Sequence, residues 1–327
     1  LYAMLMFAVA LIIRIVYQLY CRSRYSESHF KWNFNKALIK EMFGFTSWNA
    51  IGSTSVILSD HGVNILLNLF CSPIVNAARG IAMQVNSAVN SFSSNFMTAL
   101  NPQITKSYGA NDLVYYKKLM INGSRFSISL LTLLSLPIMI EAPYILQLWL
   151  GVVPEYTVNF VRLILLFAIS EAMSSTFTTG LLATGNIKVL MQTVAVLRML
   201  NLPFSYVLLS FWNIPEHTMI LAIAISQTNL FLRLILLKRI IPISIKKYVW
   251  RISFRLVLII SITFFMCDFL VSLMKPSFLR LVITSICSLC ISANLIWFLL
   301  CTKEDRIHIC HMIIKYITKK YAKIHRK

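Results

Sequence analysis

Charged side chains are scarce in this sequence, and acidic side chains are the scarcest of all. Asp, Glu, Lys and Arg make up 13% of the 327 residues, and only 11 residues are acidic. The spacing of the sequence also shows no nucleophile–base pair, phosphate-binding loop or metal-ligand motif. These absences argue against an enzyme, because catalytic sites need such groups clustered together. No catalytic residue is expected.

A paired cysteine framework is also missing. The seven cysteines fall mostly in or beside apolar segments, at positions 21, 71, 267, 287, 290, 301 and 310. Cysteines scattered in this way are typical of small core residues, whereas a framework in outward loops would indicate disulfides. One group has zinc-ligand residue types, but its spacing fits no standard zinc site: Cys301, His308, Cys310 and His311. Neither a metal nor a bound cofactor is expected.

The charged region that begins a typical signal peptide is absent. The sequence starts at Leu1 inside an apolar run, LYAMLMFAVALIIRIVY, with no basic residue before it. A signal peptide is therefore not indicated. We expect the chain to be the carboxyl-terminal part of a longer protein.

Hydrophobic residues are what the sequence has in abundance. They make up 58% of it, and the mean hydropathy of +0.73 lies outside the usual range of soluble domains. Apolar runs of about 18 to 25 residues are long enough to cross a bilayer core of about 30 Å as helices. They lack the strict alternation of barrel strands. The sequence predicts an all-α, polytopic membrane helical bundle.

Nine membrane spans are predicted from the apolar runs. They cover approximately residues 1–20, 43–70, 81–101, 122–141, 158–180, 189–211, 217–237, 252–274 and 279–300. Basic residues then accumulate on alternate sides, since one side receives those of segments 22–40, 106–118, 188, 238–255 and 303–327. The other side receives only Arg79, Lys275 and Arg280. By the positive-inside rule, the basic side and the carboxyl terminus are cytoplasmic.

The net charge of +20 therefore reflects membrane topology, and nucleic acid is not an expected partner. The tryptophans agree with the predicted sidedness, because indoles prefer membrane interfaces. Trp149 and Trp212 fall at the outer ends of spans, and the inner ends have Trp32, Trp250 and Trp297.

The predicted span 81–101 carries many polar side chains. They recur at three- and four-residue intervals: Gln84, Ser87, Ser91, Asn95, Thr98 and Asn101. A second stripe is apolar: Ile81, Val85, Val89, Phe92, Phe96 and Leu100. An unpaired buried amide costs about 1 to 3 kcal/mol, so the polar stripe needs water or partners. We expect it to border a hydrated cavity.

The preceding span, 43–70, has the same character. Its polar or amphipathic residues are Trp48, Asn49, Ser53, Thr54, Ser55, Ser59, Asp60, His61, Asn64 and Asn68. Small polar residues also permit close helix packing, and that alternative stays open for the serines and glycines. Asp60 and His61 form either a proton-responsive element or a hydrogen-bonded pair that interrupts the helix before Gly62.

Charged residues predicted within or at the ends of spans include Arg14, Asp60, Arg79, Arg162, Glu171, Arg198, Arg233 and Asp268. A charge at mid-depth costs about 2.5 to 3.5 kcal/mol, so it usually faces a pathway or an opposite charge. Glu171 and Arg198 are the most central. Two interpretations remain open: they pair as a structural bridge, or Arg198 faces an anionic substrate. The remaining arginines are expected to snorkel toward headgroups.

Several segments, taken in order, resemble a known family. They are GVNILLNLF, PIVNAARGIAMQVNSAVNSF, NFMTALNPQITKSY, YILQLWLG, VRLILLFAI and ATGNIK. They resemble the polysaccharide-flippase branch of the multidrug/oligosaccharidyl-lipid/polysaccharide exporter superfamily, which is related to the MATE transporters. The resemblance is closest over residues 40–190.

The resemblance implies a MATE-like fold of about fourteen helices, with two six-helix lobes that rock around a central cavity. The nine spans would be the last nine of these helices, and the amino-terminal part would be truncated. Four parts are then expected: residues 1–42, the last helix of the first lobe and a cytoplasmic linker; 43–237, the second lobe; 238–300, two additional helices; and 301–327, a basic cytoplasmic tail.

The activity implied by the resemblance is flipping of an undecaprenyl-pyrophosphate-linked oligosaccharide across the bacterial cytoplasmic (inner) membrane, for lipopolysaccharide or surface polysaccharide synthesis. The expected partners are this lipid-linked oligosaccharide, membrane lipids and other polysaccharide-assembly proteins. Amides and indoles suit sugar hydroxyls, and arginines suit a pyrophosphate. The expected cavity residues are Trp48, Asn49, Asp60, Asn64, Asn68, Arg79, Gln84, Asn86, Asn90, Asn95, Glu171 and Arg198.

The alternative within the superfamily is a cation-coupled MATE-type multidrug exporter. Such an exporter would need a compact carboxylate-centred site, for which the candidates are Asp60, Glu171 and Asp268. The polar stripes consist mostly of neutral amides, which favours the flippase. A membrane enzyme is disfavoured because the longest outward link, 142–157, contains a single acid, Glu155. Coupling to an H⁺ or Na⁺ gradient is compatible with either transporter.

Overall fold

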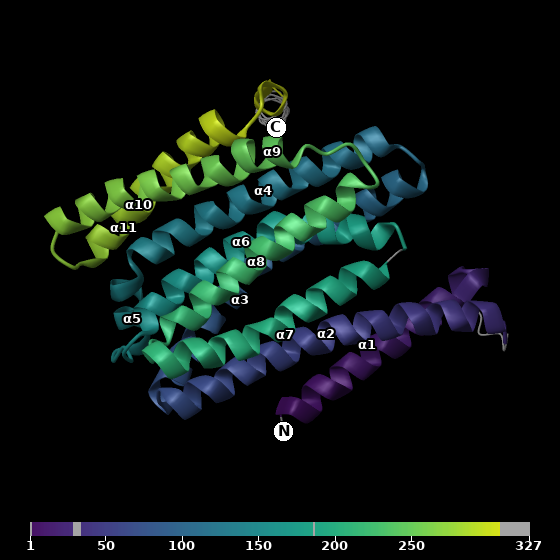
Figure 1. Ribbon diagram of the computed structural model, residues 1–327, viewed down its shortest axis with the longest axis horizontal. Coiled ribbons are helices and arrows are strands. Elements are labelled where there is room, and N and C mark those ends of the chain that lie inside the picture. Colours follow the sequence, from purple (N-terminus) through teal and green to yellow (C-terminus); the bar gives the residue numbers. More distant parts are fainter. Residues whose placement is uncertain (1, 29–33, 186, 308–327) are drawn as a thin grey trace, which may run out of the picture. The chain divides into compact units, whose positions relative to one another are not determined.

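The computed structural model describes residues 2–28, 34–185 and 187–307. Within these ranges the regular structure is helical and no residue is assigned to a strand (Figure 1). The prediction of an all-α helical bundle is therefore confirmed. Trp32, the basic tail beyond residue 307 and three residues of the rejected zinc group lie outside the described residues: His308, Cys310 and His311.

The long helices are α1 (Tyr2–Arg24), α2 (Lys36–Phe70), α3 (Pro73–Gly109), α4 (Leu113–Ile140), α6 (Thr157–Ala183), α7 (Ile187–Trp212), α8 (Glu216–Lys238), α10 (Arg255–Leu273) and α11 (Phe278–Leu295). The shorter ones are η1 (Ser26–Ser28), α5 (Ala142–Leu150), α9 (Ile245–Tyr248), η2 (Val249–Phe254) and η3 (Ile296–Leu300). A helix covers nearly all of every predicted span, with η2 and η3 extending α10 and α11 as π-helical turns.

Seven helices in the described part of the chain are long and apolar enough to cross a membrane, by length and composition. These seven are α1, α4, α6, α7, α8, α10 and α11. The two long helices outside this set are α2 and α3, which carry the polar stripes. Their polar content sets them apart from ordinary lipid-facing helices, so their place in a membrane needs a polar environment on one side.

The chain divides into two compact units, residues 1–46 and 47–327. The first contains α1, an apolar helix with Arg22 and Arg24 in its last turn, and the first part of α2. The second contains the rest of α2 and all later helices. The domain boundaries that the resemblance implies stay predictions.

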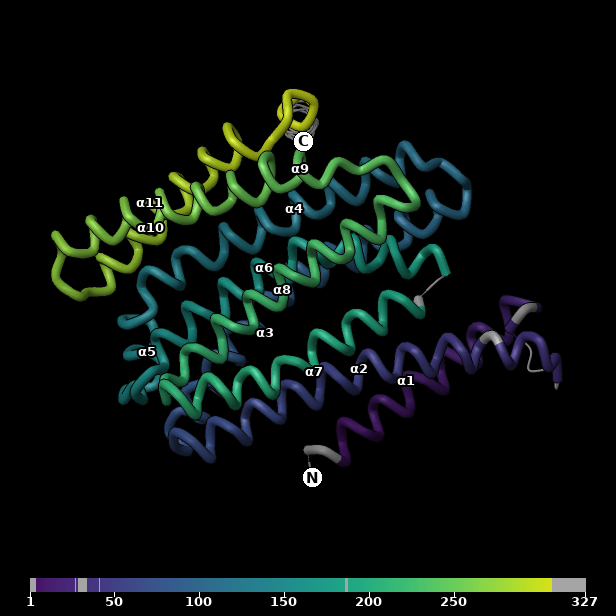
Figure 2. Tube along the Cα trace, viewed as in Figure 1, coloured from purple at the N-terminus to yellow at the C-terminus, as the bar shows by residue number. Residues whose placement is uncertain are grey.

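Helix α6 lies at the centre of the second unit. It packs against α3, α4 and α8, and α7 packs against α8; Figure 2 traces these neighbours side by side. Buried aromatic side chains of α6, Phe160 and Phe177, anchor the apolar core. Gly180 lies where α4 approaches α6: an added Cβ would come within 2.2 Å of the Met120 sulfur and 3.0 Å of the Tyr116 hydroxyl, so these side chains would have to shift. The Tyr116 hydroxyl donates to the Gly180 carbonyl at 2.8 Å.

The last two helices, α10 and α11, pack on each other and on α4. A buried polar bridge ties α11 to the end of α4: Arg280 Nη2 lies 2.9 Å from Glu141 Oε2, and the Thr284 hydroxyl donates to Glu141 Oε1 at 2.8 Å. The side chain of Glu141 is 1% exposed, and the Arg280 guanidinium also lies over the Tyr144 ring. Each of the two charges therefore depends on the other, because a single unpaired charge would be costly in this apolar region.

Replacing Glu141 with Gln should leave the Arg280 charge buried and unpaired. We expect Glu141→Gln to lower the free energy of unfolding by about 3 to 5 kcal/mol, the usual cost of breaking a buried ion pair from one side. Denaturant unfolding of the purified chain in detergent measures this. The matched control is Glu155→Gln, because Glu155 is an exposed acid on the same predicted side. Equal costs for the two variants would contradict the bridge.

Candidate functional site

Helix α3 presents one buried and one exposed face over most of its length. It starts where the Ser72 side chain accepts the Val75 N–H and Pro73 occupies the first turn. The buried face includes Ala82, Val89, Ser93 and Met97, and the Ser93 and Ser127 hydroxyls are 2.7 Å apart. The opposite face exposes the polar side chains Gln84, Ser87, Asn90, Ser91, Asn95 and Thr98. The predicted separation of polar and apolar stripes is thus present in the folded helix.

The exposed face of α3 contains two kinds of polar group. Its hydroxyls are satisfied within the helix: Ser87 donates to the Met83 carbonyl at 2.9 Å, and Thr98 to Ser94 at 2.9 Å. Three amides, those of Gln84, Asn90 and Asn95, have no hydrogen-bond partner among the described residues. These amides are therefore available to water or to a ligand, and lipid would be a costly surrounding for them.

Two residues depart from the predicted stripes of α3. Phe92, assigned to the apolar stripe, is 55% exposed beside the polar side chains. Asn101, assigned to the polar stripe, is partly buried, and its Oδ1 accepts the Thr179 hydroxyl at 2.9 Å. Near Asn101 the exposed face continues into a shallow hollow that Thr98, Thr105 and Lys106 also line.

Small residues of α2 lie at a contact with another helix, as the alternative interpretation of its polar content expected. Gly52, Ser55 and Ser59 lie buried one turn apart, on the side that meets α7. The Asn201 amide of α7 donates to the Ser59 hydroxyl at 3.1 Å. This row is a helix contact.

The larger polar residues of α2 are more accessible than this buried row. Asn68 is exposed, and Asn49 is partly exposed. Trp48 is partly exposed as well, and the ammonium of Lys188 lies 5.3 Å from the centre of its ring. The two residue classes in α2 thus have different environments.

Arg79, near the start of α3, is held by α2. Its guanidinium donates to Asn64 Oδ1 and, at 3.3 Å, to the Asp60 carbonyl, and it lies 4.0 Å from the Asp60 carboxylate. Arg79 is 7% exposed, so the prediction that it snorkels to headgroups is wrong. The Asp60 side chain is 47% exposed and faces Arg79 as its charge partner. Arg79 Nε is buried without a hydrogen-bond partner.

The interpretation of Asp60 and His61 as a helix-interrupting pair is also wrong. Helix α2 is continuous from Lys36 to Phe70, because the backbone bonds of the helix remain intact at this point. His61 is exposed on the face away from the buried row of α2. A single turn of α2 therefore directs the neighbouring Asp60 and His61 to different surroundings.

A second charged group lies among α6, α7 and α8. Arg198 Nη2 is 3.2 Å from Glu171 Oε1, so these two residues form the ion pair that was one of the two interpretations. The Arg198 guanidinium also lies 5.7 Å from the centre of the Phe167 ring. Arg233 of α8 donates to the Ser174 hydroxyl and interacts electrostatically with Glu171 and Arg198. Arg198 pairs with Glu171, and the charge of Arg233 is close enough to interact with both.

Arg233 corrects a prediction, since it was expected to snorkel at the inner side. It is 9% exposed and lies within the helix bundle. A guanidinium buried in this way is tolerated only with polar neighbours, and Ser174 supplies one. Arg162 likewise does more than snorkel, because its Nε donates to the Met139 carbonyl at 3.0 Å.

A polar network around this group was missed by sequence reasoning. The Ser170 hydroxyl donates to Ser226 at 2.9 Å, and the Gln227 amide donates to Ser170 at 2.7 Å. The sequence did contain a signal for this network. Ser170 and Ser174 are four residues apart and Ser226 and Arg233 are seven apart, and these spacings place each pair on one helix face. Apolar runs around them hid that spacing.

The twelve predicted cavity residues therefore fall into separate groups. The exposed amides are Asn68, Gln84, Asn90 and Asn95; the Arg79 group includes Asp60 and Asn64; and the third group is the Glu171–Arg198 pair. Asn86 is partly buried, and its Oδ1 has no hydrogen-bond partner. Trp48 and Asn49 lie in the first part of the second unit.

Seven apolar helices in the described part of the chain, together with the polar face of α3, indicate a multi-pass membrane protein. Comparison with known families agrees, because a family model described as MatE matches residues 52–207, from α2 to α7. The match supports a membrane transporter of the MATE-like superfamily, and it fits the expectation that the protein is not an enzyme. No curated protein and no solved structure matches the chain.

Single cysteines along α3 should report which face meets water. We expect Gln84→Cys, Asn90→Cys and Asn95→Cys to react with a membrane-impermeant thiol reagent, because their side chains are exposed and unpaired. Labelling in sealed vesicles, in a background without the native cysteines, measures this. The matched controls are Val89→Cys and Met97→Cys on the buried face. If the cysteines of both sets failed to react with the reagent added on either side of the membrane, the polar face would border no aqueous space.

The three-charge group predicts an asymmetry between variants. Glu171→Gln removes the acid with which Arg198 and Arg233 both interact, whereas Arg198→Gln leaves the acid with Arg233. We expect Glu171→Gln to cost about 3 kcal/mol of unfolding free energy, and Arg198→Gln clearly less. The first value is set low because the Glu171 side chain is 31% exposed. Denaturant unfolding in detergent gives both values, and a larger cost for Arg198→Gln would refute the arrangement.

Proposed function

We propose that this protein moves a lipid-linked oligosaccharide on an undecaprenyl-pyrophosphate-type carrier across the bacterial cytoplasmic membrane. The observation that carries the proposal is the row of unpaired amides on the exposed face of α3. From Gln84 to Asn95 and Thr98 this face extends about 20 Å along the helix, a large part of the bilayer core. A sugar chain presents hydroxyls all along its length and needs such a row of donors and acceptors.

The pyrophosphate of the carrier needs cations near this polar face. Arg198 and Arg233 share one acid, so together they keep a net positive charge inside the bundle. Arg79 offers a buried Nε without a hydrogen-bond partner. Guanidinium groups suit phosphate oxygens because they donate two parallel hydrogen bonds. We assign these arginines, together with the amides, to the transport path.

Residues 43–237 serve in this proposal as one of two lobes, and the cavity forms where the polar face of α3 meets an opposing lobe. Rocking of the lobes exposes that face to one side of the membrane and then to the other. A H⁺ or Na⁺ gradient drives the cycle, the product feeds surface polysaccharide assembly, and the tail lies in the cytoplasm. The lipid tail stays in the bilayer, so the pathway has to shield only the sugars and the phosphates.

The alternative is a cation-coupled multidrug exporter, which the family match fits equally well. Its compact carboxylate site finds less support in the contacts. Asp60 faces Arg79 at 4.0 Å and Glu171 faces Arg198 at 3.2 Å, so both acids already have a cation. Asp268 is exposed on α10. Neutral amides on α3 and engaged carboxylates elsewhere favour a sugar substrate.

A rescue experiment tests the proposal. The complete gene should restore surface polysaccharide in a bacterial strain without its own flippase. Gln84→Leu/Asn95→Leu should reduce the restored polysaccharide at least about tenfold, because each lost amide hydrogen bond contributes about 1 kcal/mol or more. Surface polysaccharide is measured by gel electrophoresis or antibody binding.

The matched control is Ser87→Ala/Thr98→Ala on the same face. Both hydroxyls already donate to carbonyls of their own helix, so this variant should retain rescue. Membrane levels of all variants are compared by immunoblot. Drug resistance without rescue of polysaccharide would contradict the flippase and favour the exporter.

A further inference from the structure

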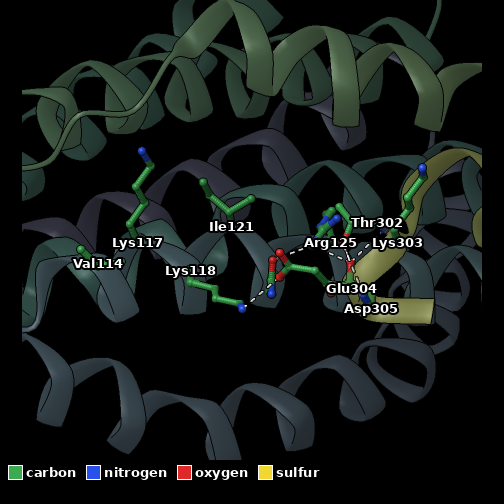
Figure 3. A pocket seen from close by; sticks show the side chains of 10 residues that line it. Val114, Lys117, Lys118, Ile121, Arg125, Thr302, Lys303, Glu304 and Asp305 are labelled. Carbon is green, nitrogen blue, oxygen red and sulfur yellow. Dashed lines mark hydrogen bonds and ion pairs between the residues drawn. The ribbon is translucent and has the colours of Figure 1, made fainter. Parts of the chain in front are cut away.

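A polar cavity lies between α4 and the last helices, and no residue of α3 lines it. It has a volume of about 520 Å³ and is enclosed by the first half of α4, by α9 and η2, and by the end of η3. An adjoining hollow shares Lys117, Asn122, Arg125 and Thr302 with it and extends toward Glu304 and Asp305 (Figure 3). We refer to the larger cavity as the basic pocket. It lies on the side predicted to be cytoplasmic.

The basic pocket has more positive charge than its acids neutralise. Five cationic side chains line it: Lys117, Arg125, Lys247, Arg251 and Arg255. Only Arg125 has an acidic partner among the described residues, Asp305 at 2.9 Å. Burial alone would raise the pKa of Asp305, but hydrogen bonds from Thr302 and the charge of Arg125 lower it, so this acid stays ionised and neutralises one cation. Four cations remain uncompensated.

The uncompensated cations differ in their availability. Lys117 donates to the Pro242 carbonyl and Arg255 to the Leu299 carbonyl, so each is positioned while keeping its charge. Lys247 and Arg251 lie one turn apart, are exposed, and have no partner among the described residues. Figure 3 shows Lys117 apart from Glu304 and Asp305, which are linked to Lys118 and Arg125. The pocket can therefore accept an anion without first breaking an ion pair.

Apolar residues give the basic pocket an amphipathic lining. Ile243, Ile252 and Leu300 are buried at its wall. Beside it, Trp250 and Phe254 stack at 4.7 Å between ring centres, and both rings are exposed. Exposed indoles are typical of the depth of lipid headgroups. Charge and apolar surface thus meet where a phospholipid has its phosphate and the start of its acyl chains.

We propose that the basic pocket binds the phosphate-bearing headgroup of an anionic glycerophospholipid of the cytoplasmic leaflet. Basic pockets between membrane helices on that side are suited to such headgroups, since the leaflet itself is anionic. The chain's own segment 308–327 is not a suitable occupant, because it contains six basic residues and no acidic one. A bound headgroup bridges α4 to α9 and η2, and so fastens the last two membrane helices to the lobe. This role is independent of which substrate the protein transports.

Native mass spectrometry of the purified chain in nanodiscs tests the proposal. The discs contain phosphatidylcholine with a graded fraction of cardiolipin or phosphatidylglycerol, and the anionic lipid that remains bound is counted. Lys247→Gln/Arg251→Gln should weaken this binding about tenfold or more, because each basic group near an anionic lipid contributes about 1 kcal/mol. The matched control is Lys238→Gln/Lys246→Gln, which removes two exposed charges of the same predicted side outside the pocket. It should change binding less than about twofold.

Two results would overturn the proposal. Equal loss in both double variants would mean that only overall surface charge attracts the lipid. Displacement of the lipid by inorganic phosphate or pyrophosphate at similar concentration, with the same dependence on Lys247 and Arg251, would assign the pocket to a soluble anion. All four charges removed are exposed, so the thermal unfolding of both variants should match that of the wild type, which verifies that each still folds.

Discussion

A polar side chain in the hydrocarbon of a membrane is stable only when something satisfies it, and most of this structure follows from that constraint. Partners inside the bundle satisfy some groups: Arg280 with Glu141 is a buried ion pair between helices, and Arg198 with Glu171 is a partly exposed one. Other groups, such as the Gln84 and Asn95 amides, have no such partner among the described residues. The first class locks helices together, and the second class needs an aqueous path.

The same constraint explains the division between α2 and α3. Both helices are rich in polar residues, but their small residues and their amides have different environments. Gly52, Ser55 and Ser59 lie buried on the side of α2 that meets α7. The Ser55 hydroxyl donates to the Gly52 carbonyl of its own helix, and the Ser59 hydroxyl accepts the Asn201 amide of α7. The amide of Asn95 has no partner among the described residues and lies on the exposed face of α3. The availability of a partner on a neighbouring helix therefore separates the paired polar groups from the exposed ones.

The basic pocket extends this argument to the membrane surface. At the headgroup level water and lipid phosphates are both available, so cations such as Lys247 and Arg251 can be exposed without a protein partner. In our proposal, the positive charge on this side has two roles: it directs the insertion of the chain, and it forms a site for anionic lipid. The match to a MATE-like family model ends at residue 207, before the pocket's second wall begins. The pocket therefore belongs to a part of the chain for which the family match implies nothing.

The sequence by itself determined the fold class, the positions of the long helices and the two faces of α3, because hydrophobic content and helical periodicity are local properties of the chain. It also indicated the Glu171–Arg198 pair. Only the tertiary structure decided that Arg79 and Arg233 are buried beside other helices instead of reaching headgroups, and that Asp60 faces Arg79. The physical reason is that a charge selects its partner across helices, and the distance between two helices is not a property of either one's sequence.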